Sequence, residues 1–482
     1  MKPIQILQNA VFAVLIVYSF ICCTQQKKQT ALAKEIKVNL NQRSLQVEGF
    51  GVNITPAQWN NGKLKPAIDM LVDDLGATLY RFDCTGLANW LDPAKRQSNG
   101  IWPESYLDSV YKSKVFTDAW ETFRYLNHKG IEPFFNVSGR INPGLGKSGK
   151  EWNTLADFDG YAEMVVSMLH WARYQEHLKF NLLAPFNENN YGYPEGSLID
   201  GPEMVKVTQA IIHKLIDYKL NDIQLILMDA TYPDLNLLAR HLADTTLAMS
   251  GKVRAYAAHC YVNGDPCDLQ SLCKSKSDYA LFTEMVSDSH IQGISSWLSE
   301  YGDLDRSGEI EYEVAWNSTL RLMKRLSDGF NAALVWDAFD NFHQHNNAWT
   351  EYGLLKTDTI NWTYIPKKRY YAAKQVYRFV KPGWKMVEII TPQPIDCHIR
   401  ILVFVSPDGN DYTMVVMNRI ESDVDLSINL NDVGNVTLSK TVHHFVTDKT
   451  DNCSSKKDPS VSGHIIRVLL PEKSISTITT LK

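Results

Sequence analysis

The sequence lacks several features that would place it in a specialised class of protein. It contains no internal repeat, no low-complexity segment and no cysteine pair with CxxC spacing, so nothing in it favours a zinc or thioredoxin-like site. The sequence has no large excess of either sign of charge, because the net formal charge is a mildly acidic −5. Nothing therefore indicates nucleic acid or an anionic membrane surface as a partner. With 44% hydrophobic and 21% charged residues, the composition is that of a globular protein with ample material for a core.

The N-terminal apolar run is too short for a comfortable membrane span. Ala10–Ile21 follows the positive charge of Lys2 and is followed by Cys22-Cys23 and the polar stretch TQQKKQ, which resembles a bacterial lipoprotein signal. We expect residues 1–23 to be this signal, with Cys23 acylated, and residues 24–34 to be a polar tether. The protein is then exported and lipid-anchored to a bacterial membrane, at the outer membrane or cell surface, without spanning it. A plain signal peptide is the alternative.

Two interpretations stay open for the other six cysteines. Cys267 and Cys273 are close enough in sequence to close a small loop in an oxidising compartment. Alternatively, most of the six are free core thiols. The set comprises Cys84, Cys260, Cys267, Cys273, Cys397 and Cys453.

The middle of the chain alternates short β-branched or aromatic runs with helix-length amphipathic stretches. This alternation is typical of βα units and predicts an α/β fold, a (β/α)8 TIM barrel over residues 48–382. The strands are expected at Val47–Asn53, Thr78–Phe82, Ile131–Asn136, Phe180–Asn187, Ile223–Asp229, Val253–Tyr261, Ile294–Glu300 and Ala332–Asp337. Helices are expected between them, for example at Tyr161–Leu178, Glu203–Tyr218 and Tyr312–Leu326, and the last at Lys367–Val380.

Beyond Gly383 the pattern changes to short alternating runs separated by Asp, Asn and Gly. It predicts a small antiparallel β-sandwich over residues 383–482. The N-terminal residues 35–47, with the runs Glu35–Val38 and Leu45–Val47, are expected to join this sandwich and clamp it to the barrel. The other sandwich strands are expected at Arg400–Val405, Tyr412–Asn418, Val424–Ile428, Val436–Leu438, His443–Val446, Ile465–Leu470 and Ser474–Thr480.

Two glutamates stand where barrel strands are expected to end, which is where such barrels carry function. The fourth strand ends in Asn187-Glu188 and the seventh in Ser299-Glu300. Cleavage of a glycosidic bond needs such a pair: one carboxylic acid protonates the leaving oxygen, and one carboxylate attacks or stabilises the anomeric centre. We therefore expect Glu188 to be the general acid/base and Glu300 the nucleophile of a retaining β-glycosidase.

The other strand ends carry side chains suited to support this pair. Arg81 and Tyr261 are expected to donate hydrogen bonds to Glu300 and favour its charged form. Asn187 is a candidate for the sugar 2-hydroxyl, an interaction that strengthens in the transition state. Trp336 offers a ring for the sugar to stack on. Further candidates for substrate contact are His259, Asn136 and Trp90; His259 and Tyr261 could also be core groups, and Trp90 a loop anchor.

These strand ends resemble clan A of the glycoside hydrolases, most closely family 30, although families 39 and 5 share the clan features. The family 30 likeness rests on Gly49-Phe50-Gly51, Ser299-Glu300-Tyr301-Gly302, Arg369-Tyr370-Tyr371, Phe379-Val380-Lys381-Pro382-Gly383 and Leu470-Pro471…Ser474. Family 30 often has Asn-Glu-Pro where this chain has Asn187-Glu188-Asn189. The resemblance implies a retaining hydrolase of a polysaccharide or oligosaccharide and leaves the sugar and the linkage open.

Three alternatives accompany this interpretation. Glu-Tyr-Gly recurs at Glu351, which follows a polar loop and is interpreted as loop structure or substrate rim. His343 and His345 invite a metal site, but no third ligand stands at a recognisable spacing, so we expect neither metal nor cofactor. A catalytically inactive glycan-binding lipoprotein is the alternative function. The expected partner is carbohydrate alone, and the expected state is a monomer.

Overall fold

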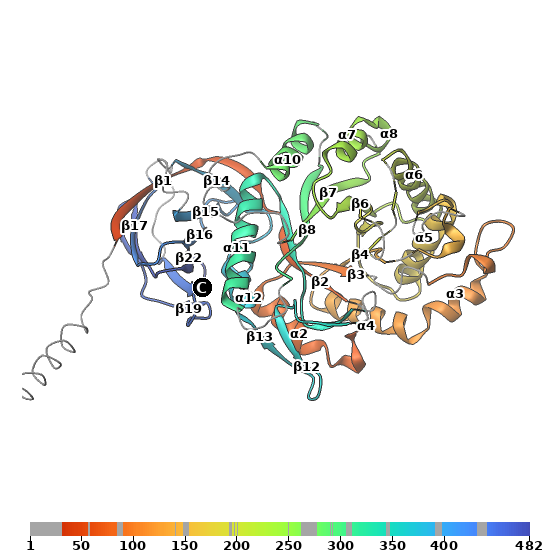
Figure 1. Ribbon diagram of the computed structural model, residues 1–482, viewed down its shortest axis with the longest axis horizontal. Coiled ribbons are helices and arrows are strands. Elements are labelled where there is room, and N and C mark those ends of the chain that lie inside the picture. The colour runs from red at the N-terminus through yellow and green to blue at the C-terminus, as the bar shows by residue number, and fades with distance from the viewer. Residues whose placement is uncertain are drawn as a thin grey trace, which may run out of the picture.

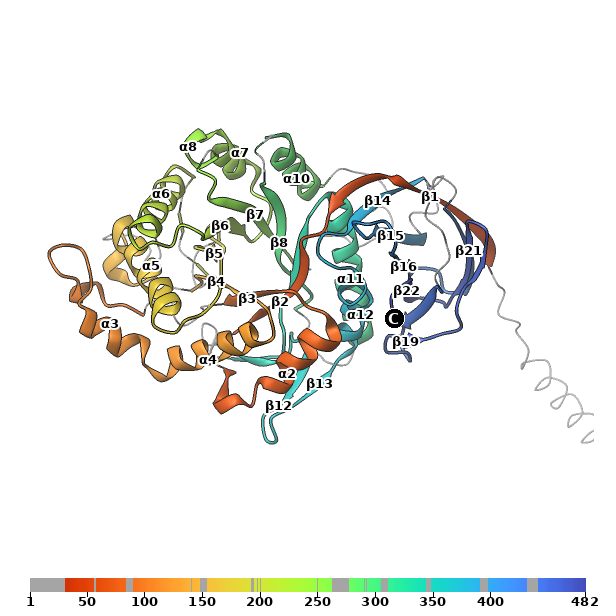
Figure 2. The ribbon, with the colours of Figure 1, turned by 180° about the vertical axis from the view of Figure 1, so that it is seen from behind.

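A computed structural model describes residues 31–482 apart from 56–57, 84–89, 140, 148–153, 192–194, 197, 200, 249, 262–276, 290, 292, 305–310, 344–347, 391–397 and 431–440. The described chain forms a closed eight-stranded barrel surrounded by helices and, beside it, a ten-stranded sheet (Figure 1). The helices α11 and α12 lie between the two parts, and the view from behind in Figure 2 shows the same arrangement.

All eight predicted barrel strands are present and pair in parallel in sequence order, with the first strand closing against the last. They read as nearly continuous apolar runs because both faces are covered, one by helices and one by the barrel interior. That interior is packed by large and small side chains such as Phe134, Trp297 and Ala257. The strands are β2 (Gly49–Ile54), β3 (Leu79–Asp83), β4 (Phe134–Asn136), β5 (Leu182–Ala184), β6 (Gln224–Ala230), β7 (Val253–Cys260), β8 (Ser295–Tyr301) and β9 (Ala332–Val335).

The barrel helices follow the strands as expected. Among those that the structure describes, none combines the length and the apolar character that a membrane span requires. They are α2 (Lys65–Asp69), α3 (Glu104–Tyr111), α4 (Lys114–His128), α5 (Phe158–Tyr174), α6 (Gly201–Asp217), α7 (Leu235–Ala243), α8 (Thr245–Ala248), α10 (Asp278–Asp288), α11 (Glu311–Asp328) and α12 (Lys368–Tyr377).

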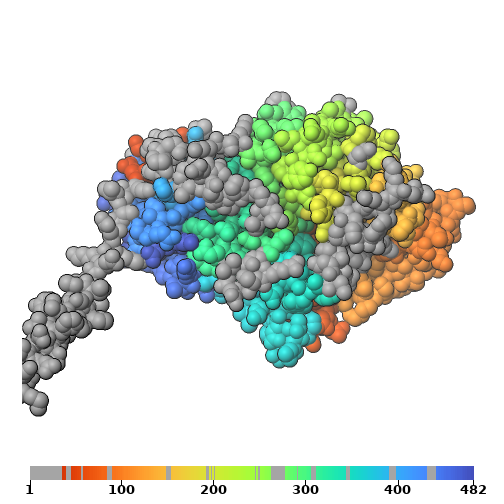
Figure 3. All heavy atoms as spheres, in the orientation of Figure 1, coloured from red at the N-terminus to blue at the C-terminus, as the bar shows by residue number. Residues whose placement is uncertain are grey.

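Two small hairpins that were not expected from the sequence lie between β9 and α12. They pair β10 (Asn341–His343) with β11 (Ala348–Thr350), and β12 (Leu355–Asp358) with β13 (Thr363–Pro366). The space-filling view in Figure 3 shows the cyan atoms around β12 and β13 protruding at the lower edge of the molecule.

The second domain is one sheet whose strands enclose a separate core, including Ile36, Val416, Leu426 and Ile466. It is antiparallel except where β1 pairs with β17. Its order is β19-β18-β22-β16-β15-β14-β1-β17-β21-β20. The bounds are β1 (Ala31–Gln46), β14 (Lys385–Ile390), β15 (Ile399–Val405), β16 (Tyr412–Asn418), β17 (Val424–Asn429), β18 (His443–Thr447), β19 (Ser454–Ser455), β20 (Ser460–Ser462), β21 (Ile465–Leu470) and β22 (Ser474–Thr479).

The N-terminal residues join this sheet as expected, but they form one long strand where two short runs were expected. β1 begins at Ala31, inside the segment expected to be a tether, and crosses the polar residues between the two apolar runs. A register shift between Asn39 and Arg43 lets the strand continue there against β14. The strand expected at Val436–Leu438 lies outside the described residues.

The two domains share backbone pairing and a core. Val47 N donates to Trp384 O at 2.8 Å and Gly383 N to Val47 O at 2.7 Å, so the chain enters and leaves the barrel through one paired point. Sandwich side chains such as Phe404 and Met417 belong to the same buried cluster as the barrel helices. The sandwich therefore covers apolar surface of the barrel.

We predict that removing the residues after Pro382 gives insoluble protein, because the shared cluster would be exposed to water.

A point substitution that tests the same contact is Phe404→Ala, since Phe404 is fully buried in that cluster. It should lower the free energy of unfolding by about 3–5 kcal/mol in urea titrations. Leu469→Ala is the matched control: Leu469 is 55% exposed in the same domain, and its replacement should change stability by less than about 0.5 kcal/mol. A soluble, active truncation would show that the sandwich is independent.

Candidate active site

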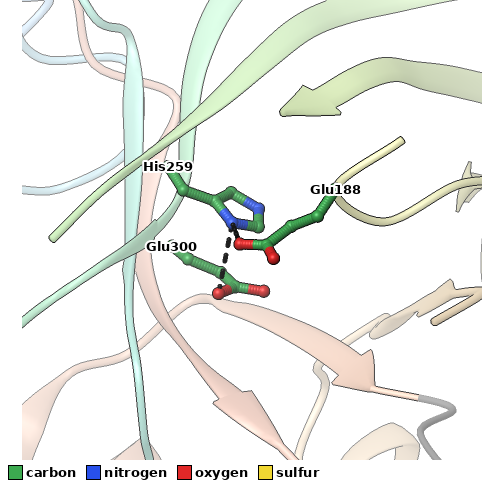
Figure 4. Close-up of side chains that lie close together, drawn as sticks. All are labelled: Glu188, His259 and Glu300. Atoms are coloured by element: carbon green, nitrogen blue, oxygen red, sulfur yellow. Dashed lines mark hydrogen bonds and ion pairs between the residues drawn. The ribbon is translucent and has the colours of Figure 1, made fainter. Parts of the chain in front are cut away.

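Two glutamates meet at the carboxyl ends of barrel strands. Glu188 follows β5, the fourth strand, and Glu300 lies near the end of β8, the seventh. Both side chains are largely buried. Figure 4 shows the two carboxylates close together, with the ring of His259 beside them. The barrel thus brings together the two side chains that the sequence singles out.

His259, from β7, contacts both glutamates. Its Nδ1 lies 2.9 Å from Glu188 Oε1 and 3.3 Å from Glu300 Oε2. One carboxylate oxygen of each glutamate and this nitrogen all lie within 4.8 Å of one another. Burial alone would lower the pKa of His259, but the negative charges of Glu300, Asp229 and Glu188 outweigh it and raise that pKa to about 10. The surrounding carboxylates therefore favour the imidazolium form of the histidine.

Glu300 receives the two hydrogen bonds expected for it. Arg81 Nη1 donates to its Oε1 at 2.5 Å, and the Tyr261 hydroxyl donates to its Oε2. Burial nevertheless raises the pKa of Glu300, while the charges of His259 and Arg81 act in the opposite direction. The donors favour the charged form as expected, but they work against the desolvation of a buried carboxylate.

Asp229, to which no role was assigned from the sequence, lies at the centre of the cluster and contacts both Arg81 and His259. It lies at the end of β6, the fifth strand, and is fully buried. Its Oδ2 accepts from Arg81 and Asn136, and its Oδ1 faces His259 Nε2 and accepts from the Ser299 hydroxyl. Burial alone would raise the pKa of Asp229, but Arg81 and His259 hold it well below its usual range. The signal was present, since the predicted fifth strand ends on this residue.

The backbone at Glu188 and Asp229 departs from regular strand geometry. Both residues have a left-handed φ, 44° at Glu188 and 48° at Asp229, and Met228 has 71°. The register of β6 against β7 shifts between Met228 and Ala230. Asp229 O accepts the Glu188 amide at 2.8 Å, which joins the two irregular segments. Such conformations cost free energy and cluster at functional sites.

Three other candidates lie in or beside this cluster. Asn136 Nδ2 donates to Asp229 Oδ2 at 2.9 Å. Asn187 Oδ1 accepts from Arg81, and its Nδ2 donates to the carbonyl of Glu195. Trp336, directly after β9, is partly exposed, with its ring centroid 5.2 Å from that of His343. Gly302 allows this approach of strand ends, because a Cβ there would lie 2.7 Å from Trp336 O.

Several candidates lie elsewhere. The Trp90 indole N–H donates to Tyr111 at 3.3 Å, and its ring packs edge-on to Phe116, which favours the loop-anchor interpretation. Glu351 is exposed between β11 and β12, as a loop residue would be. Cys23 lies outside the described residues, and so do Cys84, Cys267, Cys273 and Cys397. Cys260 is buried and accepts a hydrogen bond from Arg325 Nε at 3.4 Å, and Cys453 is partly exposed.

Two further residues near the cluster carry no role in the sequence analysis. Asn53, on β2, accepts from Arg81 Nη1 at 2.7 Å and donates to the carbonyls of Ser299 and Val335. Burial and then the negative charges of Glu188, Glu300 and Asp83 raise the pKa of Glu195 to about 8. An asparagine in a strand or a glutamate in a loop gives no signal of this kind in a sequence.

The three side chains Glu188, His259 and Glu300 could in principle bind a metal ion, but His259 already has hydrogen-bond partners at both ring nitrogens. Glu188, His259 and Glu300 each offer one ligand atom within reach of a shared cation. However, His259 Nδ1 faces Glu188, and its Nε2 faces Asp229. His343 is buried with Nε2 3.5 Å from Asp337 Oδ2, and His345 lies outside the described residues. The expectation of a site without metal or cofactor stays a prediction.

Comparison with known proteins finds likeness in fold and not in sequence. No model of a protein family and no curated protein matches the chain. The family 30 subfamily 8 xylanase Xyn30A from Clostridium acetobutylicum superposes with a TM-score of 0.69 at 15% identity, over 92% of this chain and 99% of that one. SrfJ from Salmonella typhimurium gives 0.69 at 14% identity, over 95% and 94%. An endo-β1,6-glucanase gives 0.63 at 15% identity, over 93% and 94%.

The chain has the fold of the family 30 glycoside hydrolases. The barrel, the sandwich and the N-terminal strand that joins it are thus the architecture that the sequence motifs led us to expect. At these identities the likeness establishes the fold only, and the reaction has to be argued from the side chains at the strand ends.

We predict that His259 makes the stability of the protein depend on pH. Its pKa is about 10 in the folded chain and about 6.5 in an unfolded one. The stabilisation from its charged form is therefore fully present below about pH 6.5 and is lost as the pH rises toward about 10. In urea titrations, the difference in unfolding free energy between the wild type and His259→Asn should shrink over this interval. His128→Asn, on the exposed surface of α4, controls for replacing a histidine. A constant difference from pH 6 to pH 10 would contradict the assignment.

Proposed function

We propose that the protein is a retaining β-glycoside hydrolase that acts on a polysaccharide or oligosaccharide by double displacement. One observation carries the proposal. Glu188 and Glu300 project from the carboxyl ends of two barrel strands into one buried cluster, with a carboxylate oxygen of each within 4.8 Å of the other. Paired carboxylates in such a position are the requirement for glycoside cleavage.

The separation favours retention of configuration. In inverting enzymes the carboxyl groups stand about 6.5–9.5 Å apart, because a water molecule must fit between one carboxylate and the anomeric carbon. In retaining enzymes they stand about 5–5.5 Å apart, and one carboxylate attacks the carbon directly. Oxygens of Glu188 and Glu300 that lie at most 4.8 Å apart support the shorter, retaining arrangement.

The different partners of the two glutamates support their roles. Glu300 has three: Arg81, Tyr261 and the imidazolium of His259. This positive surrounding suits a carboxylate that attacks while ionised and leaves again as an anion. Glu188 has His259 as its side-chain partner among the described residues. Glu188, which has fewer partners, is then assigned as the general acid/base.

The reaction then runs in two steps. Glu300 forms a bond to the anomeric carbon while the glycosidic C–O bond breaks, and the leaving oxygen takes the proton of Glu188. Water next attacks the same carbon, gives its proton to the Glu188 carboxylate and releases Glu300. Asn187, beside Glu188, and Trp336, at the end of the eighth strand, are the residues we assign to the sugar 2-hydroxyl and to stacking on the ring.

The structural neighbours support a glycosidase and leave the sugar open. They include family 30 xylanases, an endo-β1,6-glucanase and an α-L-arabinofuranosidase, all on this fold. Such a spread means that the barrel supports hydrolysis of different glycans, so the fold does not select one. Whether the enzyme cleaves within a chain or at its end is open for the same reason.

We propose export and lipid anchoring from the sequence alone. The signal segment and Cys23 lie outside the described residues, and the resemblance to a lipoprotein signal is what supports them. A lipid anchor would keep a monomeric hydrolase at the surface of a bacterial cell, where it would meet carbohydrate.

We predict that the first product released from a β-glycoside is the β-anomer. Formation and hydrolysis of the glycosyl-enzyme each invert the configuration at the anomeric carbon, so the product retains the configuration of the substrate. Proton NMR during the first minutes of turnover, before the anomers equilibrate, measures this directly. Immediate release of the α-anomer would rule out the double displacement. Binding of glycans without any turnover on a broad panel would favour the inactive glycan-binding alternative.

We predict that replacing the two glutamates has different consequences. In Glu188→Ala, natural glycans should be cleaved about 10²–10⁴-fold more slowly, because the leaving group is not protonated. An aryl glycoside with a good leaving group should still form the glycosyl-enzyme, and added azide should accelerate turnover and give a β-glycosyl azide. In Glu300→Ala, activity should fall for every substrate because no covalent intermediate forms.

The azide product decides between the two assignments. The roles are exchanged if the β-azide arises from Glu300→Ala and none forms from Glu188→Ala. Normal activity of both variants on natural glycans would refute the site. Glu351→Ala is the matched control, since Glu351 stands in the second Glu-Tyr-Gly but is an exposed loop residue, and its variant should keep both activities.

A further inference from the structure

Asp229 has no role in the two steps above, yet it contacts both cationic partners of the glutamates. No part of its side chain can contact a substrate, because it is fully buried behind Arg81 and His259. A buried carboxylate that loses its pairing is strongly destabilising, so its presence at this position requires an explanation.

One oxygen of Asp229 fixes the guanidinium of Arg81. Oδ2 accepts from Arg81 Nε at 3.2 Å and from Nη2 at 2.7 Å, which is a side-on contact with two donors. A planar guanidinium that donates through two of its nitrogens to one carboxylate oxygen cannot rotate about its long axis. The remaining donor, Nη1, therefore points in a set direction, and that direction is Glu300 Oε1, at 2.5 Å.

The other oxygen fixes the ring of His259. Oδ1 lies 3.1 Å from Nε2, and the second ring nitrogen, Nδ1, lies 2.9 Å from Glu188 Oε1. A carboxylate at Nε2 requires an N–H there, and a carboxyl group at Nδ1 is best served by a second N–H, so the geometry favours the doubly protonated ring. The same contact aims Nδ1 between the two glutamates.

We propose that Asp229 is the positioning residue that orients both catalytic glutamates, Glu300 through Arg81 and Glu188 through His259. This inference rests on the proposed hydrolase function and adds to it a single residue on which both steps depend. Asn136 and Ser299, which donate to Asp229, keep that carboxylate in place. The charges also balance, since Arg81 and His259 are positive and Asp229 and Glu300 are negative.

The charge state of His259 depends on groups from several strands. The ionisable side chains that act on it come from β6, β8 and the segment after β5: Asp229, Glu300, Glu188 and Glu195. Arg81 from β3 and Tyr261 directly after β7 contact the same carboxylates. Asp229 is the one of these carboxylates that contacts Nε2, so its neutralisation should change the titration of His259 while both catalytic groups are still present.

The kinetic test is Asp229→Asn, which keeps the shape and removes the charge. We expect kcat to fall about 100-fold, the size typical of a misplaced catalytic group, with KM little changed. The fall should be similar for natural glycans and for an activated aryl glycoside, and azide should not restore the rate. This pattern differs from that of Glu188→Ala, which spares the activated substrate. An Asp229→Asn enzyme with the kcat of the wild type on both substrates would overturn the proposal.

A measurement independent of turnover follows His259 itself. With histidine labelled at Cε1, the NMR signal absent from His259→Asn belongs to His259. In the wild type this signal should keep its imidazolium shift up to about pH 8, and in Asp229→Asn its titration midpoint should move down by about 1–3 pH units. An unchanged midpoint would overturn the proposal. If the midpoint moves but no glycan is hydrolysed by the wild type, the hydrolase function fails and the positioning contact stands.

Two controls guard against loss of folding. Glu163→Gln removes another buried carboxylate, one whose partners are Lys214 and the Tyr218 hydroxyl, and it should leave kcat and the His259 signal unchanged. If Asp229→Asn does not fold, the double variant Asp229→Asn/His259→Asn removes one buried charge of each sign. It should recover a cooperative unfolding transition in urea, because it leaves neither charge of the pair buried without its partner. A double variant that also fails to fold would show that the two charges are not coupled and would overturn the proposal.

Discussion

Charged groups buried at the mouth of the barrel must be paired, and the arrangement of the candidate site depends on this requirement. An isolated charge in such an environment is expensive, while a cluster that alternates sign and satisfies its hydrogen bonds is tolerated. Here Asp229 lies between Arg81 and His259, and these two cations lie against Glu300 and Glu188. The two glutamates can therefore lie close to each other and out of water. Without these cations, two buried carboxylates at this distance would repel each other.

The barrel makes this pairing possible because it brings distant parts of the chain to one edge. Arg81, Asp229 and Glu300 come from the second, fifth and seventh barrel strands. Parallel strands end on the same side, so their last residues meet there whatever their separation in sequence. The left-handed residues Glu188 and Asp229 then turn the chain locally, and the hydrogen bond between their main chains ties these turns together. Within the described chain, the sandwich does not reach the charge cluster. It stabilises the barrel by covering apolar surface beside α11 and α12.

The sequence predicts the helices and strands whose apolar residues recur at regular spacing. It does not predict roles that arise from contacts between residues far apart in the chain. Apolar runs covered on both faces, such as β6 and β8, have a strong pattern and were predicted close to their observed bounds. Glu188 and Glu300 could be predicted because strand ends are few and glutamates at them are conspicuous. Asp229 also ended a predicted strand, but an aspartate there reads equally well as a polar end of a strand. The hairpins β10–β13 are too short for a periodic signal, and Asn53 acquires its importance only from Arg81 across the barrel.

The same reasoning explains why the fold leaves the sugar undetermined. The side chains that pair charge in the cluster come from strand ends, and their positions are fixed by the barrel and by one another. The segments after the strands are less constrained, and they include the hairpin β10–β11, where Phe342 and Trp349 form an exposed cross-strand pair. Loops tolerate change because they carry little of the buried core. Structural neighbours at 13–16% identity therefore combine one barrel with xylanase, glucanase and arabinofuranosidase names. In the proposed hydrolase, specificity then depends on side chains that the charge cluster does not constrain.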